Sequence, residues 1–198
     1  MEHVEKSFVD KYRPIKMTYH EMMDSSEFSS SRQLERAVKK ITQKDPNFLD
    51  PYLMLCEAYQ EEGKSNKAEE ILDQAYNRAI ELITDENGNW PEYLVWGFTE
   101  NRHIIRAIFN RAVAFWDRGE TDQALDLLRK LLKTNPPDNV GARNYILAIR
   151  MNISFDEYED RFDKGGYYDS ESINWFEMNA PDYPDEFGWW FEWTDEHM

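Results

Sequence analysis

The sequence predicts an all-α protein built from antiparallel helix pairs. Three observations lead to this prediction. Apolar residues recur at helical spacing in several windows, glycine, asparagine and proline separate these windows, and one pair of windows recurs 56 residues later in the chain. No stretch alternates apolar and polar residues over the length of a typical strand.

The apolar windows give the expected helices in order. Their ranges are about 52–62, 66–83, 100–118, 121–134 and 139–151. The apolar residues Leu34, Val38 and Ile41 predict a further helix before the first pair, and a short helix is expected over 154–162 after the last one.

Particular residues are expected to end and begin these helices. Gly63 and Gly119 follow apolar windows and suit the left-handed C-cap position, where a Cβ atom is unfavourable. Thr99 is expected to cap the helix over 100–118, and Asp138 or Asn139 the helix over 139–151.

Two helix pairs share one register. The first has Tyr52, Leu55, Cys56, Tyr59, Gly63, Ala68, Leu72 and Ala75. The second has Ile108, Arg111, Ala112, Phe115, Gly119, Ala124, Leu128, Leu131 and then Pro136. This spacing resembles the tetratricopeptide repeat (TPR), a helix–turn–helix of about 34 residues. The resemblance implies a TPR-like right-handed α-solenoid of antiparallel helix pairs, in which small Ala68 and Ala124 let paired helices pack closely.

A narrower resemblance covers Trp96 to Arg143. The stretches WGFTENRHIIRA and LLKTNPPDNVGAR are similar to loosely characterised bacterial TPR proteins and to relatives of the suppression-of-tumorigenicity family. Those proteins have WG-x-x-ENR and NP-x-DN-x-G-x-R stretches. The resemblance implies a TPR scaffold and no known chemistry.

These patterns divide the chain into three parts. Residues 1–30 are expected to be an N-terminal extension, and 31–162 a TPR-like repeat domain with an aromatic insert near 81–102. Residues 163–198 are expected to form an acidic aromatic C-terminal tail.

Charge and composition exclude several classes of function. The 198 residues carry a net charge of −16, which disfavours nucleic acid and anionic lipid as partners. A single cysteine, Cys56, excludes a disulfide framework, and the absence of a signal peptide or a long apolar run predicts a cytoplasmic protein. The charge is uneven, because 101–150 carries +4 and 151–198 carries −12.

The TPR resemblance implies a concave groove lined by the first helix of each pair. In that register the groove of the last two units contains Arg106, Phe109, Val113, Trp116, Arg143, Leu147 and Arg150. Arginine forks bind carboxylates and aromatic rings add contact area, so the expected partner is a protein or peptide with acidic or C-terminal carboxylate groups. The lysine–asparagine clamp of chaperone-binding TPR domains is absent, since Leu53 and Glu57 occupy its positions.

The leading hypothesis is therefore a non-enzymatic scaffold or adaptor with no catalytic, cofactor or metal residues. One alternative is an enzyme or small-molecule binder that uses a polar region of Glu100, Arg106, Asp138 and Arg143. Another is an acidic inhibitor that binds a basic protein through the tail. A metal site is not expected at Glu100 and His103, because no second Glu-x-x-His accompanies them.

The C-terminal segment is both acidic and rich in aromatic side chains. Residues 151–198 contain thirteen aromatic and fourteen acidic side chains, which is unusual for a purely solvating segment. The tail could cap the last helix pair, dock in the groove or bind a partner. At least one of Trp189, Trp190 and Trp193 is expected to be buried against the helical body.

Overall fold

The all-α prediction is confirmed over the part of the chain that can be described. The computed structural model describes residues 7–25, 28, 30–163 and 170–197, so parts of the predicted extension and tail lie outside the described residues. Within the described ranges there is no β-strand, and an isolated bridge joins Ser7 to Tyr93.

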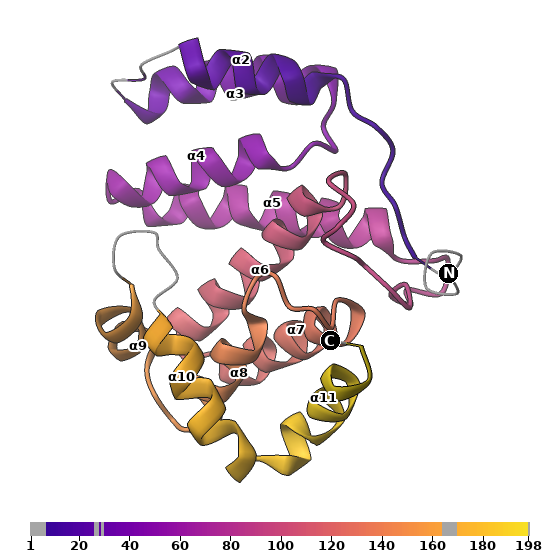
Figure 1. Ribbon diagram of the computed structural model, residues 1–198. Coiled ribbons are helices and arrows are strands. Elements are labelled where there is room, and N and C mark those ends of the chain that lie inside the picture. Colours follow the sequence, from indigo (N-terminus) through magenta and orange to yellow (C-terminus); the bar gives the residue numbers. More distant parts are fainter. Residues whose placement is uncertain (1–6, 26–27, 29, 164–169, 198) are drawn as a thin grey trace. The chain divides into compact units, whose positions relative to one another are not determined.

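The helices follow the predicted windows closely (Figure 1). They are α2 (Ile15–Ser25), α3 (Ser31–Lys44), α4 (Asp50–Glu61), α5 (Ser65–Ile83), α6 (Arg102–Asp117), α7 (Thr121–Thr134), α8 (Ala142–Arg150), α9 (Phe155–Phe162), α10 (Ser170–Asn179), the 3-10 turn η1 (Ala180–Asp182) and α11 (Pro184–His197). Helices α3 to α9 match the predicted elements. Helices α2, α10 and α11 lie in segments for which no helix was predicted.

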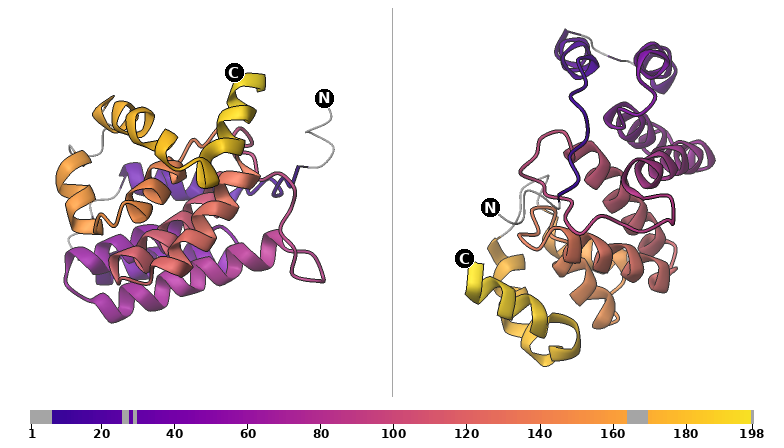
Figure 2. Two further views of the ribbon diagram at one scale, coloured as in Figure 1. Left: turned by 90° about the horizontal axis from the view of Figure 1, so that it is seen from below. Right: turned by 90° about the vertical axis from the view of Figure 1, so that its right-hand side faces the viewer.

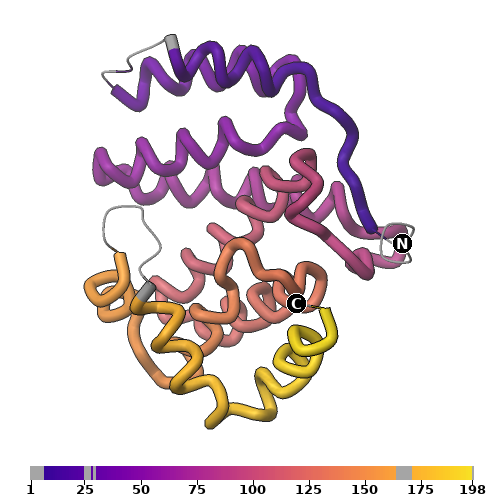
Figure 3. The backbone as a smooth tube through the Cα atoms, viewed as in Figure 1, coloured from indigo at the N-terminus to yellow at the C-terminus, as the bar shows by residue number. Residues whose placement is uncertain are grey.

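The chain divides into two compact units, Met1–Arg111 and Ala112–Met198, with the boundary inside α6. In the first unit, adjacent helices pack in sequence order, α2 on α3, α3 on α4 and α4 on α5. Figure 3 follows the chain back and forth through these four helices, and Figure 2 shows α2 and α3 side by side, nearly end-on in its right-hand view. In the second unit, α7 packs on α8, and α8 packs on α10.

Helix α2 belongs to the core of the first unit. Tyr19 is buried with Ile41 of α3 and with Phe48, and the rings of Tyr19 and Phe48 meet edge to face with centroids 5.4 Å apart. Ile15, Met22 and Met23 pack against this cluster. Their spacing with Tyr19 is that of one apolar helix face, which explains why the supposed extension folds as a helix here.

The two predicted glycine turns have the same geometry. Gly63 and Gly119 both have positive φ angles, +68° and +75°. The residue after each glycine donates its backbone N–H to the carbonyl five residues earlier, Lys64 to Tyr59 and Glu120 to Phe115, each at 2.8 Å. This is the hydrogen bond of a Schellman C-cap. The 56-residue register therefore recurs in backbone geometry, and both small residues of the register, Ala68 and Ala124, are buried.

Substitution by alanine should have opposite effects on stability at two glycines of the second unit. A Cβ atom at Gly119 or Gly188 would meet nothing within 4 Å, so only backbone conformation distinguishes them. Gly188 lies inside α11, where alanine should stabilise the helix by about 0.5–1 kcal/mol. Gly119→Ala should instead destabilise by about 1–2 kcal/mol, because its φ is positive. Thermal unfolding of the two variants checks this, and equal shifts would contradict it.

Two helices begin later than predicted. Helix α6 begins at Arg102, because the N–H of Asn101 bonds to the Phe98 carbonyl in a preceding turn, so the prediction that Thr99 caps this helix is wrong. Helix α8 begins at Ala142, because Asp138 and Gly141 both have positive φ angles that a helix cannot contain. The N-cap residue of α8 is Gly141, not Asp138 or Asn139 as predicted, although the Asp138 carboxylate accepts the backbone N–H of Ala142 at 2.7 Å.

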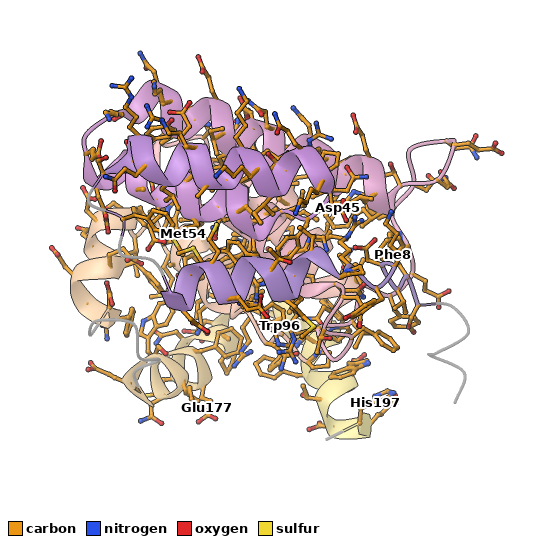
Figure 4. The ribbon with its side chains drawn as sticks, turned by 90° about the horizontal axis from the view of Figure 1, so that it is seen from above. Phe8, Asp45, Met54, Trp96, Glu177 and His197 are labelled. Carbon is orange, nitrogen blue, oxygen red and sulfur yellow. The ribbon has the colours of Figure 1, made fainter. Side chains whose placement is uncertain are left out.

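A buried polar network fixes the segment before α2 to the rest of the first unit. Arg13 donates to both oxygens of Asp45 at 2.6 and 2.7 Å and to Asp10 through Nε and Nη2. Asp10 also lies 3.0 Å from Nε2 of His103. Figure 4 labels Asp45 at the end of α3 and Phe8 on the segment leading to α2, at the same end of this helix pair.

Backbone groups complete this network. The N–H of Leu49 donates to Nδ1 of His103 at 3.3 Å, which assigns the imidazole proton to Nε2 and makes it a donor to Asp10. Asn101 binds the N–H of Asp10 and the carbonyl of Phe8. Burial alone would raise the pKa of Asp10, but His103 and Arg13 together lower it below its ordinary value.

Among the residues that the structure describes, no helix is both long and apolar enough to cross a membrane.

Candidate functional site

The seven residues predicted to bind a partner are divided between the two units. Arg106 and Phe109 lie in the first unit, and Val113, Trp116, Arg143, Leu147 and Arg150 in the second. Trp116 and Leu147 are buried, whereas the other five are half-buried. The three arginines are thus the members of this set that can present charged groups at a surface.

Trp116 belongs to an aromatic cluster in the second unit. Its ring meets those of Tyr145, Phe155 and Tyr158, with centroids 5.5–5.6 Å apart. The cluster continues from Tyr158 to Trp175 of α10. None of these rings belongs to residues 180–198, so Trp116 has a packing role within the second unit.

Arg106 is paired inside the first unit. Its guanidinium donates to both oxygens of Asp50 at 2.6–2.9 Å and lies over the ring of Trp96. Arg102 lies over the same ring and donates to the Trp96 carbonyl. Arg106 therefore contributes to a local ion pair with Asp50 and to a cation–π contact with Trp96.

Arg143 and Asp138 form a compact turn before α8. Asp138 accepts the N–H of Ala142 and, through its other oxygen, the N–H and Nη1 of Arg143 at 3.0 and 2.9 Å. The Asp138 side chain is 1% exposed. Burial raises the pKa of Asp138 to about 6, despite the opposing effects of Arg143 and of the two backbone N–H groups. The polar region predicted as an alternative site is thus made of separate pairs, Arg106 with Asp50 and Arg143 with Asp138.

The guanidinium of Arg143 also contacts the C-terminal segment. It lies over the rings of Phe176 and Trp190, 5.3 and 5.1 Å from their centroids. The indole Nε1 of Trp190 donates to the Pro136 carbonyl at 2.9 Å. The turn before α8 is therefore a contact surface for aromatic side chains of α10 and α11.

A second contact joins α7 and α8 to the start of α11. Arg129 of α7 and Arg150 of α8 both hold the carboxylate of Glu186, with Arg129 Nε at 2.8 Å and Arg150 Nη1 at 2.6 Å. Arg150 also donates to Asp185 at 2.8 Å and lies over the ring of Tyr183. Burial would raise the pKa of Glu186, but the two arginines lower it below its ordinary value.

A cleft of about 220 Å³ opens beside this contact. It is lined by Arg129, Leu132, Lys133, Arg150, Asp185, Glu186 and Trp189. Lys133 lies one helical turn after Arg129 on α7 and is exposed. We call Arg129, Lys133, Arg143 and Arg150 the basic surface of the second unit. Within the described part of the chain none of these four cations pairs with an acidic residue of α7 or α8. Arg143 pairs with Asp138 in the turn before α8, and Arg129 and Arg150 pair with Glu186 of α11.

Arg129 and Lys133 were missed by the sequence analysis. The TPR register directs attention to the first helix of each pair, and both residues lie on the second. A signal was present, because Asp126 is placed four residues before Lys130 and pairs with it at 2.8 Å, leaving Arg129 and Lys133 without an acidic residue at that spacing. Glu186 could not be singled out among fourteen acids in 151–198.

The described residues contain no group of three His, Cys, Asp or Glu side chains placed to hold a metal ion. The two ring nitrogens of His103 are bound to Asp10 and to Leu49 as described above.

No protein-family model matches the chain, and no curated protein or solved structure shows significant similarity to it.

Proposed function

We propose that this protein is a non-enzymatic interaction adaptor of the TPR type, and that the basic surface of its second unit binds an acidic segment of a partner protein. The observation that carries the proposal is the recognition of Glu186. Two arginines from adjacent helices converge on one carboxylate, and one of them also holds the neighbouring Asp185. Such arrangements recognise a carboxylate through the directions of the hydrogen bonds as well as through its charge.

Aromatic contacts support the same chemistry. Arg143 lies over Phe176 and Trp190, and Arg150 lies over Tyr183. Some arginine side chains of this surface stack on aromatic rings and others hold carboxylates. The surface therefore favours binding of segments that contain both acidic and aromatic residues. The recurring turns at Gly63 and Gly119 support the TPR-type arrangement of the helix pairs.

The enzyme alternative draws on one feature, the raised pKa of Asp138. A shifted acid in an open cleft would favour catalysis. Asp138 is buried, however, and both of its carboxylate oxygens accept hydrogen bonds from α8. It does not line the 220 Å³ cleft. We therefore assign Asp138 to helix capping and to the positioning of Arg143.

A binding measurement with a defined probe tests the adaptor function. The probe is a fluorescently labelled peptide with the sequence of residues 183–197, which carries adjacent acids and tryptophans. The protein is the full chain with Glu186→Gln, which removes the charge that Arg129 and Arg150 hold. We expect saturable binding in fluorescence anisotropy that weakens as salt is raised.

Two controls separate recognition from general charge attraction. Adding Arg129→Gln or Arg150→Gln, each as a single further substitution, should weaken binding by about tenfold or more, as expected for loss of charge-assisted hydrogen bonds. Adding Arg118→Gln removes an equal charge from an exposed pair with Glu120 and should change affinity less than twofold or so. A scrambled peptide of the same composition should bind more weakly. Absent binding, or equal binding by all variants and both peptides, would refute the adaptor function of this surface.

A further inference from the structure

We infer that α11 is an intramolecular competitor, which occupies the basic surface of the second unit until a partner helix of the same chemistry displaces it. The partner segment would carry two adjacent acids in its first helical turn and a tryptophan four residues after the second acid, as Asp185, Glu186 and Trp190 do. This inference rests on the proposed function, since it concerns the ligand and the regulation of the same site.

The contacts of α11 are concentrated in its first two turns. Glu186 and Phe187 are buried, and Trp190 is half-buried with its indole bound to Pro136. From Glu192 onward no residue of the described helix is buried, and the side chains of Glu192, Asp195, Glu196 and His197 are exposed. Figure 4 labels His197 near the end of this helix. A partner helix would thus have to replace a short stretch of contacts.

The two arginines that hold α11 and the acid Asp185 are partly exposed, whereas the side chain of Glu186 is 8% exposed. The side chains of Arg129 and Arg150 are 41% and 27% exposed, and that of Asp185 is 65% exposed. When α11 leaves, these arginines become solvated and are not left as buried unpaired charges, so the penalty of breaking a buried ion pair does not apply to them.

Tethering compensates for the modest strength of these contacts. A segment joined to its own binding surface has an effective concentration of about millimolar, so weak contacts suffice to keep it docked. A free partner competes with this local concentration. The apparent affinity of the partner equals its intrinsic affinity multiplied by the fraction of molecules in which the surface is open. A small open fraction therefore weakens binding.

The surface also has a feature that α11 leaves unused. Lys133 lines the cleft beside Glu186 and has no carboxylate partner within the described residues. The side chains of α11 that line this cleft are Asp185, Glu186 and Trp189, and the arginines Arg129 and Arg150 hold the two carboxylates. A partner helix with a further carboxylate near this position would gain a contact that α11 lacks, which favours exchange.

The test measures binding of the labelled peptide of residues 183–197 to the unmodified chain and to three full-length variants. If α11 competes, Glu186→Gln should bind the peptide about tenfold tighter than the unmodified chain, because weaker docking opens the surface. Gly188→Ala should bind it about two- to fivefold more weakly, because alanine strengthens α11 and its docked state. The Asp185→Asn variant changes an exposed residue and weakens the docking of α11 at a second position, so it should also tighten peptide binding.

The outcomes distinguish this inference from the function on which it rests. If all of these proteins bind the peptide equally, and binding still requires Arg129 and Arg150, then the adaptor function stands and competition by α11 is refuted. If Glu186→Gln does not fold, as judged by circular dichroism, the opposite shifts of Asp185→Asn and Gly188→Ala still decide the matter. If no protein binds the peptide, the proposed function fails, and the inference fails with it.

Discussion

Replacement of Arg13 by alanine is expected to lower the free energy of unfolding of the first unit by about 3–5 kcal/mol. The side chains of Arg13 and Asp10 are 3% and 5% exposed, and Arg13 also neutralises Asp45. Without the guanidinium, His103 is the one side-chain donor that the buried carboxylate of Asp10 keeps among the described residues. A buried charge that loses its partner is among the most destabilising changes known.

Urea denaturation followed by circular dichroism measures this effect. The matched control is Arg118→Ala, which breaks an ion pair with Glu120 in which both side chains are about one-third exposed. Surface pairs of this kind contribute roughly 0–1 kcal/mol. A loss below about 1 kcal/mol for Arg13→Ala would show that the network around Asp10 does not hold the segment before α2 in place.

The second large effect is a dependence of stability on pH that originates at Asp138. Its pKa is about 6 in the folded protein, against an ordinary value of 3.8. The folded state therefore binds the proton more tightly than the unfolded state does. The stabilisation from this group is fully present below about pH 4 and is lost as pH rises through 6, with a total of about 3 kcal/mol.

Comparison with Asp138→Asn isolates this contribution. Asparagine tolerates the positive φ of 52° at this position and can still accept the Ala142 N–H, but it does not titrate. We expect the unfolding free energy of the unmodified protein, minus that of the variant, to fall by up to about 3 kcal/mol between pH 4 and pH 7. A constant difference across this range would mean that Asp138 stays charged, held by Arg143 and the two backbone donors.

The predictions that succeeded depend on short stretches of sequence. The apolar face of α7 and the turns at Gly63 and Gly119 involve residues within about one or two helical turns of one another. Helix α2 could have been predicted from the same spacing, through Ile15, Tyr19, Met22 and Met23. The start of α6 was misplaced because Asn101 is held by Phe8 and Asp10, which lie more than ninety residues away in sequence.

The sequence predicted the type of interaction at the candidate site, but it identified only some of the residues that form the site. The excess of positive charge in 101–150 and the acidic aromatic tail indicated that arginines would meet carboxylates. The register of a single helix pair could not show that Arg150 shares Glu186 with Arg129. It also could not show that Trp116 lies in an aromatic cluster with Tyr145 and Phe155.

The sequence by itself determined the all-α class, the order of the paired helices and the 56-residue recurrence, because helix periodicity, caps and glycine turns act between near neighbours. The tertiary structure alone decided which charges meet. His103 reaches Asp10 across 93 positions in sequence, and Arg129 reaches Glu186 across 57. A chain with 23 basic and 39 acidic side chains offers many possible ion pairs, and only the packing of helices selects those that form.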